Sequence, residues 1–332
     1  MSDSEQLPDG LLLVDKPGAL PSGAVSDEQD YSHLSERERA PSPTSHDIVQ
    51  MVRRWSRQRR IGHTGTLDPM ASGLLVLCLG KATRLVEYYQ GHAKTYLAQI
   101  RLGTATDTYD GQGKVVKELP IPKLDRTQLE SALDQFRGAI MQTPPIYSAL
   151  KQQGESLHRK ARRGEKVTIK PRPITIHELI LVDWNGIDRI DLRIRCSAGT
   201  YIRSLAHDLG IALGTAAHLG ALRREGAGAF RLTDAYDLNK IAAAAADGRL
   251  SDLLLAPGTG LDLPAMTLDS EQVRLLGYGQ QISIADSTTA EADLNRAYDN
   301  NGNFVGIIRC LTGQKSDAGR ARWKAEKWFG QQ

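Results

Sequence analysis

The sequence has few aromatic residues and few cysteines. Phe, Trp and Tyr make up 5% of its 332 residues, and there are three cysteines, Cys78, Cys196 and Cys310, with no Cys-x-x-Cys pair. An odd number of widely spaced cysteines argues against a disulfide framework and against a zinc site. We therefore predict buried, reduced thiols in a cytoplasmic protein.

Long hydrophobic runs are also missing. The first apolar run, Leu11 to Val14, is too short for the core of a secretory signal, and Leu74 to Leu79 is far short of a membrane span. The net charge of only +3 says little about partners. With 40% hydrophobic residues, the chain has enough apolar side chains for two domains, or for one large domain with an appendage.

The spacing of apolar residues predicts an α+β fold with a mixed or antiparallel sheet flanked by helices. Strands are expected within 10–18, where the last residues form a turn, and at 74–79, 96–102, 174–182 and 189–196. Helices are expected after Ser45 and after Thr200, which we predict as their N-caps, and from Leu238 to Leu255. Short strand patterns return after residue 262 and predict a small β-rich domain at 263–332, after a catalytic domain at 1–262.

One loop stands out for its composition. Gly62 to Gly73 reads GHTGTLDPMASG and directly precedes the apolar run Leu74 to Leu79. Its glycines and proline predict a shaped loop whose only acid is Asp68. A carboxylate fixed in this way could be a reactive group, but loop chemistry alone favours a tight turn whose Asp accepts bonds from backbone amides.

The segment GHTGTLDPMASGLLVLCLGKATRL resembles the catalytic motif of the TruB family, the tRNA pseudouridine-55 synthases. Further blocks occur in the family's order, namely DKPG at 15–18, TSHD at 44–47, TDTYD at 106–110, GTYIR at 199–203 and the stretch from Ala217 to Phe230. The resemblance spans most of the first two-thirds of the chain. It implies a pseudouridine-synthase catalytic domain. The tail from residue 263 looks like the small PUA-like, RNA-binding domain that many family members carry, and a β-rich appendage of unrelated origin is the alternative.

The chain departs from the family pattern near its N-terminus. In the family the DKP and TSHD blocks are almost adjacent, whereas here a polar stretch of residues 20–43 separates them. Its Ser, Pro and charged residues predict a disordered surface insertion.

The resemblance implies that Asp68 is the catalytic nucleophile and that Arg203 keeps it ionised. It leaves open whether Asp68 attacks C6 of the uracil, attacks C1′ of the ribose or removes a ribose proton. From the residues alone, Arg203 would be a charge on a helix surface. No metal or cofactor is expected, because the isomerisation needs neither.

Other family positions imply a pocket for the uracil. Tyr96 would stack on the base, Tyr201 and Leu222 would close the pocket, and His63 would assist base flipping. Without the resemblance, the residues alone favour a core role for Tyr96 and Leu222 and a hydrogen-bonded structural role for His63. Arg84 and Asp110 match positions that imply charges surrounding the catalytic pair.

Basic clusters predict contacts with an RNA backbone. One precedes the loop and the other lies between residues 151 and 172; the residues assigned to the backbone are Arg57, Arg59, Arg60, Arg159, Lys160, Arg162 and Arg163. The expected partner is the T-arm of tRNA, bound by a monomer. The alternatives are a guide-dependent synthase subunit and a non-catalytic tRNA-binding or folding protein.

Overall fold

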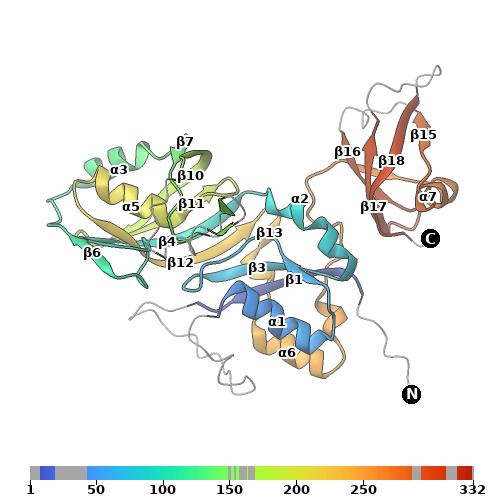
Figure 1. The fold of residues 1–332 in the computed structure, drawn as a ribbon, viewed down its shortest axis with the longest axis horizontal. Coiled ribbons are helices and arrows are strands. Elements are labelled where there is room, and N and C mark those ends of the chain that lie inside the picture. The colour runs from blue at the N-terminus through green and yellow to red at the C-terminus, as the bar shows by residue number, and fades with distance from the viewer. Residues whose placement is uncertain are drawn as a thin grey trace.

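The computed structural model describes residues 8–18, 43–148, 151–152, 155–156, 163, 169–285, 293–311 and 320–330. The predicted insertion at 20–43 lies outside this described part, apart from Pro43. The basic residues Arg159, Lys160 and Arg162 also lie outside it. Figure 1 shows a large sheet with helices around it and a smaller sheet at the C-terminal end.

The large sheet has nine strands within the described residues. Its main path runs β1 (Gly10–Lys16), β3 (Ser72–Leu79), β12 (Ala217–Ala227), β4 (Lys94–Leu102), β11 (Arg189–Cys196), β10 (Arg172–Trp184) and β7 (Gly138–Gln142). Two short strands join it, β2 (Ile61–His63) beside β3 and β13 (Phe230–Arg231) beside β12. Only the β3–β12 pairing is parallel, so the sheet is mixed, as predicted.

Helices and short elements surround this sheet. They are α1 (Ser45–Ser56), η1 (Gly80–Leu85), α2 (Val86–Gln90), β5 (Thr104–Thr106), β6 (Val115–Glu118), α3 (Arg126–Asp134), β8 (Lys151–Gln152), β9 (Glu155–Ser156), α5 (Ile202–Ala212), η2 (Leu232–Asp234), α6 (Leu238–Ala246) and η3 (Leu250–Leu253). No helix in the described ranges is long and apolar enough to cross a membrane.

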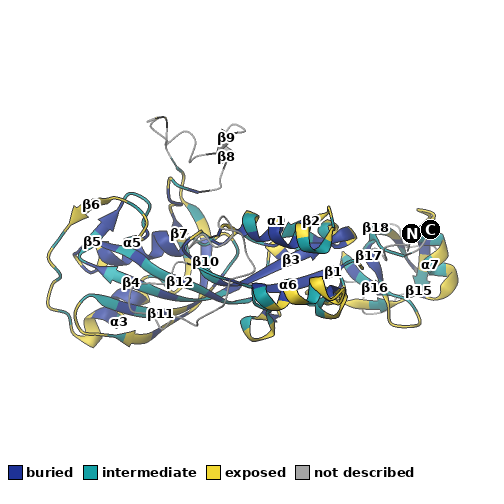
Figure 2. Ribbon diagram, turned by 90° about the horizontal axis from the view of Figure 1, so that it is seen from below, coloured by how far each residue is buried: buried dark blue, intermediate teal, exposed yellow. Residues whose placement is uncertain are grey.

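Strands β1 and β3 are buried on both faces. Leu12 of β1 and Leu75 of β3 pack in one core together with residues of α1 and α6, whereas Leu11 and Leu74 point into a second core that contains Tyr89. Figure 2 shows both strands as buried, with α1 and α6 beside them. This double burial explains why their sequences are continuous apolar runs rather than alternating ones.

The C-terminal sheet has five strands, and one helix, α7 (Ser270–Gly277), packs on it. The strand order is β14 (Ala265–Thr267), β16 (Leu294–Tyr298), β17 (Phe304–Cys310), β18 (Arg320–Trp328) and β15 (Ile282–Ala285). Trp323 and Ile308 lie at the centre of its own core. The strand patterns read from the sequence after residue 262 are therefore confirmed.

The three cysteines are buried, and Cys78 and Cys196 are free thiols. Burial raises the pKa of the Cys78 thiol to about 12 and that of Cys196 to about 11. The prediction of buried free thiols is confirmed, and high pKa values make the two thiols inert at neutral pH.

Three predicted helix limits were wrong. Thr44, not Ser45, caps α1: its hydroxyl accepts from the Asp47 amide, and the Asp47 carboxylate accepts from the Thr44 amide. Tyr201, not Thr200, stands at the N-cap of α5, and its side chain makes no capping bond. The helix that starts at Leu238 ends at Ala246 because Gly248 takes the left-handed conformation, at a φ of 70°, that terminates helices.

Gly73 is required where β12 approaches β3. Its φ is +99°, and a Cβ there would lie 2.4 Å from the carbonyl oxygen of Arg224. We predict that Gly73→Ala lowers the free energy of unfolding by roughly 1–3 kcal/mol more than Gly248→Ala. Gly248 is the matched control, because it also has a positive φ but nothing lies within 4 Å of its added Cβ. Equal losses in urea unfolding would show that β12 can move away from β3 at no cost.

Candidate active site

The loop that carries Asp68 joins β2 to β3 and is held by three buried side chains. Ser45 donates to the Leu67 carbonyl at 3.1 Å and accepts from the Leu67 amide at 2.9 Å. Lys16, which is fully buried, donates to the carbonyl oxygens of Pro69 and Ala71 at 3.1 and 2.7 Å. Arg224 donates to the Gly65 carbonyl at 3.1 Å. The loop backbone is therefore fixed from α1, β1 and β12.

Asp68 and Arg203 form a two-point ion pair. Arg203 Nε lies 2.8 Å from Asp68 Oδ2, and its Nη2 donates to Oδ1 at 3.1 Å. The guanidinium is almost wholly buried, with 7% of its side chain exposed, whereas Asp68 keeps 33% exposed. A hydrogen bond from Nη2 and a close ionic contact from Nε fix direction as well as charge, so the carboxylate is held in one orientation at the edge of the solvent.

The remaining donors of Arg203 are also occupied. Its Nη1 donates to the Thr108 carbonyl at 3.1 Å and lies 3.5 Å from Asp110 Oδ2, and its Nη2 donates to the Tyr147 carbonyl at 3.0 Å. Asp110 itself is buried and accepts from the Thr108 hydroxyl at 2.7 Å. Asp110 therefore lies beside the ion pair, where the sequence reading placed it.

Asp68 opens into a pocket of about 710 Å³. The predicted residues Tyr96, Tyr201, Arg203 and Leu222 all line it. Tyr201 is fixed by Gln142, whose amide group exchanges two bonds with the Tyr201 backbone, at 2.8 and 3.0 Å, and by the guanidinium of Arg172, 4.8 Å from the centre of its ring. The structure thus gathers side chains from β4, α5 and β12 around Asp68.

Two cations in the pocket wall were not foreseen. Lys94 and Arg224 are both buried, and Lys94 donates to the carbonyl oxygens of Gln90 and His92, each at 2.6 Å. Arg224 donates to the Leu74 carbonyl at 2.6 Å and stands opposite Tyr96 in the β12–β4 pairing. The sequence contained a sign of these cations. Lys94 stands two residues before Tyr96, and Arg224 stands two residues after Leu222. Alternation along a strand puts each cation on the same face as that neighbour, where a core residue is expected.

The charges in this pocket perturb one another. Burial raises the pKa of the Asp68 carboxyl, the Arg203 guanidinium opposes that rise, and Asp110 adds to it. Burial lowers the pKa of Lys16 to about 8 and that of Lys94 to about 8. Burial also raises the pKa of the Tyr96 hydroxyl. Perturbed groups that share one cleft are a mark of a functional site.

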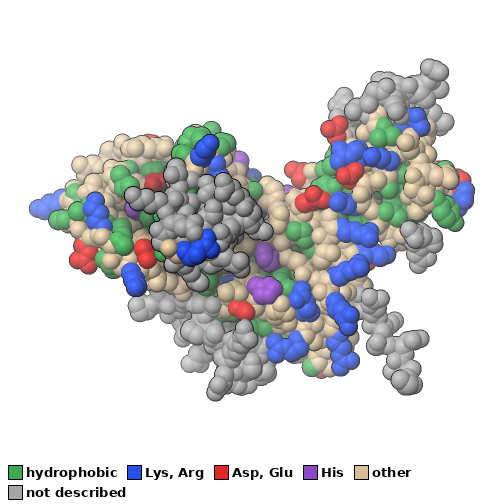
Figure 3. All heavy atoms as spheres, viewed as in Figure 1, with side chains coloured by type: hydrophobic (Ala, Val, Ile, Leu, Met, Phe, Trp, Pro, Cys, Tyr) green, Lys and Arg blue, Asp and Glu red, His purple; other side chains and the backbone are tan. Residues whose placement is uncertain are grey.

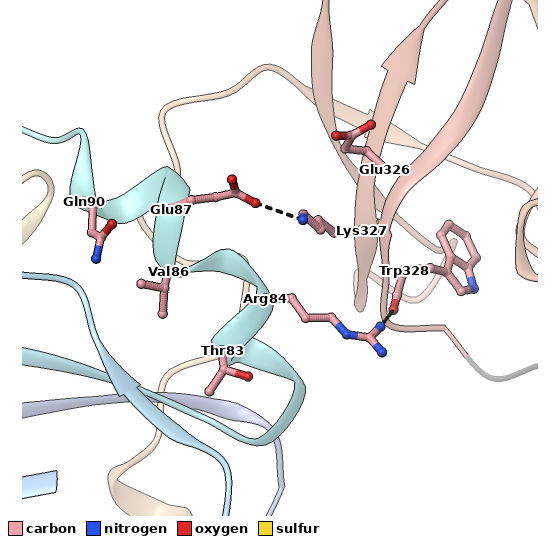
Figure 4. Close-up of a pocket in the computed structure, with 8 residues that line it drawn as sticks. All are labelled: Thr83, Arg84, Val86, Glu87, Gln90, Glu326, Lys327 and Trp328. Carbon is pink, nitrogen blue, oxygen red and sulfur yellow. Dashed lines mark hydrogen bonds and ion pairs between the residues drawn. The ribbon is translucent and has the colours of Figure 1, made fainter. Parts of the chain in front are cut away.

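His63 and Arg84 lie outside this pocket. His63 ends β2 opposite Leu77, and burial together with the nearby Arg224 lowers its pKa. Arg84 is on η1 and donates to the Trp328 carbonyl of the C-terminal sheet at 3.2 Å (Figure 4). The structure does not bring Arg84 to the Asp68–Arg203 pair, because its guanidinium bonds to the C-terminal sheet and it does not line the pocket.

The predicted RNA-backbone residues Arg57, Arg59, Arg60 and Arg163 are exposed. Figure 3 shows Lys and Arg side chains in a band that runs from the region of α1 toward the C-terminal sheet. Among the described residues, no cluster of three or more His, Cys, Asp or Glu side chains could hold a metal ion.

Comparison with known proteins identifies this architecture. Residues 53–202 match the family model of the TruB family pseudouridylate synthase N-terminal domain, and residues 203–259 match that of the tRNA pseudouridylate synthase B C-terminal domain. Together the two models cover more than half of the chain. The chain belongs to the TruB family of pseudouridylate synthases.

Named TruB-family relatives extend the match over most of the chain. A tRNA pseudouridine synthase B of Dehalococcoides mccartyi is 42% identical over 80% of this chain and 88% of its own length. A Xanthomonas campestris protein of the same name is 39% identical over 90% and 89%. A solved Cbf5-Nop10-Gar1 complex contains a chain with the same fold, at a TM-score of 0.69 and 22% identity, over 98% of this chain and 85% of that one.

The raised pKa of Asp68 predicts how activity depends on pH. If the reaction needs the carboxylate, the rate should fall as acidification protonates Asp68, and the midpoint should lie above about 3.9, the value of an unperturbed Asp. Single-turnover rates of uridine isomerisation at saturating RNA, measured from pH 8 down to pH 4, test this. A rate that stays constant down to pH 4 would mean that the ion pair outweighs burial.

Proposed function

We propose that this chain converts uridine to pseudouridine at position 55 in the T-loop of tRNA, with Asp68 as the nucleophile. The observation that carries the proposal is the carboxylate of Asp68, held at two points by Arg203 in a pocket whose wall includes Tyr96. The relatives in Dehalococcoides mccartyi and Xanthomonas campestris, which are named tRNA pseudouridine synthase B, support tRNA as the substrate.

The pocket suits a base that has been taken out of an RNA stack. A volume of about 710 Å³ is within the range that holds small ligands. Tyr96 supplies a flat face, Leu222 and Tyr201 supply further walls, and the base is held while its bond to the ribose breaks and re-forms through carbon. Extruding the base costs a few kcal/mol, which RNA contacts outside the pocket must offset.

Charge in and around the pocket supports a polyanionic substrate. Lys94 and Arg224 add buried positive charge to that of Arg203, which Asp68 and Asp110 already balance in part. A flipped nucleotide brings its phosphate with it, and these cations would offset that charge. His63, just outside the pocket, would occupy the space that the extruded base leaves.

Further phosphate contacts would come from exposed basic residues. They are Arg57, Arg59 and Arg60 after α1, together with Arg159, Lys160, Arg162 and Arg163. The C-terminal domain, residues 263–332, would be a PUA-like RNA-binding module beside the catalytic domain of residues 1–262. Its separate sheet and core support this division. The enzyme would act as a monomer on the T-arm of tRNA in the cytoplasm.

A direct test uses bare tRNA and the purified chain. Mass-spectrometric mapping should find pseudouridine at position 55, and Asp68→Asn should abolish its formation while tRNA affinity stays within a few fold. Asn has nearly the same shape but is no nucleophile, whereas most of the binding energy comes from phosphate contacts. Conversion only in the presence of a guide RNA, or by the Asn variant at more than a small percentage of the normal rate, would contradict the proposal.

Tyr96 should contribute through its ring and its hydroxyl separately. Tyr96→Phe keeps the stacking face but loses the hydroxyl that would act on the proton leaving C5, so we expect normal tRNA binding and slower product formation. Tyr96→Ala should lose both rate and capture of the base. Thermal melts and single-turnover rates of both variants decide between this role and packing alone. A fully active Phe variant and an Ala variant that melts much earlier would identify Tyr96 as a core residue.

A further inference from the structure

Two aromatic rings stack behind the Asp68–Arg203 pair. The centres of the Tyr109 and His207 rings are 3.9 Å apart, and their planes differ by 7°. Both side chains are half-buried, and neither is among the residues that line the Asp68 pocket. The proposed chemistry uses neither ring, so the stack needs another explanation.

Tyr109 has an unusual backbone conformation. Its φ is +62°, which few residues other than glycine adopt, so the surrounding contacts must hold it there. The residues on either side both contact one guanidinium: the Thr108 carbonyl and the Asp110 carboxylate each face Arg203 Nη1. A left-handed residue between them reverses the chain locally and lets both groups reach the same nitrogen.

His207 is four residues after Arg203 on α5, so the two side chains share a face of that helix. The stack therefore joins the loop of residues 106–111 to the same helix face that carries Arg203. On its other side the loop is bonded to β12: the Leu219 amide donates to the Tyr109 carbonyl, and the Gly111 amide donates to the Leu219 carbonyl, both at 3.0 Å. The loop is thus held between α5 and β12.

We propose that the Tyr109–His207 stack positions Arg203. By fixing the loop of residues 106–111 against α5, the stack keeps the Thr108 carbonyl and the Asp110 carboxylate where they aim the guanidinium at Asp68. Tyr109 and His207 touch neither Asp68 nor the pocket and act only through Arg203. The expected effect on the reaction rate rests on the proposed role of Asp68. The expected effect on the position of Arg203 does not.

The variants separate the ring from the backbone. Tyr109→Gly removes the ring but accepts a positive φ without strain, Tyr109→Phe keeps the ring and is the matched control, and His207→Ala removes the other half of the stack. At saturating tRNA we expect Tyr109→Gly and His207→Ala to lower the single-turnover rate about tenfold or more, with tRNA affinity unchanged, because a small misplacement of a catalytic group is costly. Tyr109→Phe should stay near the normal rate.

The double variant Tyr109→Gly/His207→Ala tests whether the rings act as a unit. Its rate should be no lower than that of the slower single variant, because each substitution already removes the whole stack. Multiplied losses would show that the residues act independently and would overturn the proposal.

Two further readouts distinguish positioning from a merely structural role. Because Arg203 opposes the rise in the pKa of Asp68, a misplaced guanidinium should move the acid limb of the rate to higher pH. Arg203, Asp110 and Lys16 are the charges that act on Asp68, and the substitutions remove none of them. A lower melting temperature with an unchanged rate and acid limb would mean that the stack only stabilises the fold.

The last readout does not depend on activity. Arg203 Nε is buried and lies 2.8 Å from Asp68 Oδ2, so its ¹⁵N–H signal should be slow to exchange in the unmodified protein and in Tyr109→Phe. It should broaden or be lost in Tyr109→Gly and His207→Ala. If the unmodified protein fails to modify tRNA, the proposed function is wrong, and this signal still decides the role of the stack: an unchanged signal in all variants would refute it.

Discussion

The site depends on keeping one carboxylate charged and aimed in a place that water reaches only in part. Burial disfavours the charged form of Asp68, and the paired bonds from Arg203 are the main opposing contribution. The guanidinium can do this because its own burial is compensated by the Thr108 and Tyr147 carbonyls and by Asp110. Removing one partner of such a buried pair leaves the other charge uncompensated, which is costly.

The same requirement shapes the loop around Asp68. A loop next to a core strand exposes carbonyl groups that need donors, and Ser45, Lys16 and Arg224 provide them from three different elements. Strand β3, buried on both faces, anchors the end of the loop, and Gly73 permits the close approach of β12. The contacts that pack the sheet therefore also fix the position of Asp68.

Much of the pocket around Asp68 could be predicted from sequence because its members stand in short ordered motifs. Asp68, Tyr96, Tyr201, Arg203 and Leu222 all line one pocket, as the motifs implied. Helix caps were less predictable. Thr44 and Ser45 are equally good cap residues, and only the tertiary fold sends Ser45 to the Leu67 backbone. Arg84 stands close to the motif in sequence, yet its guanidinium bonds to the Trp328 carbonyl of the C-terminal sheet and not to the Asp68–Arg203 pair.

The sequence by itself determined the alternation of burial, the mixed α+β sheet and the motif residues, because hydrophobic period and local turn chemistry act over a few neighbouring residues. Tertiary structure alone decided which distant groups meet. Arg224 lies in the pocket wall because antiparallel pairing puts it opposite Tyr96. The Tyr109–His207 contact joins a loop to a helix about a hundred residues later. Such meetings depend on strand order and register, which are set by the global packing of the core and not by any local pattern.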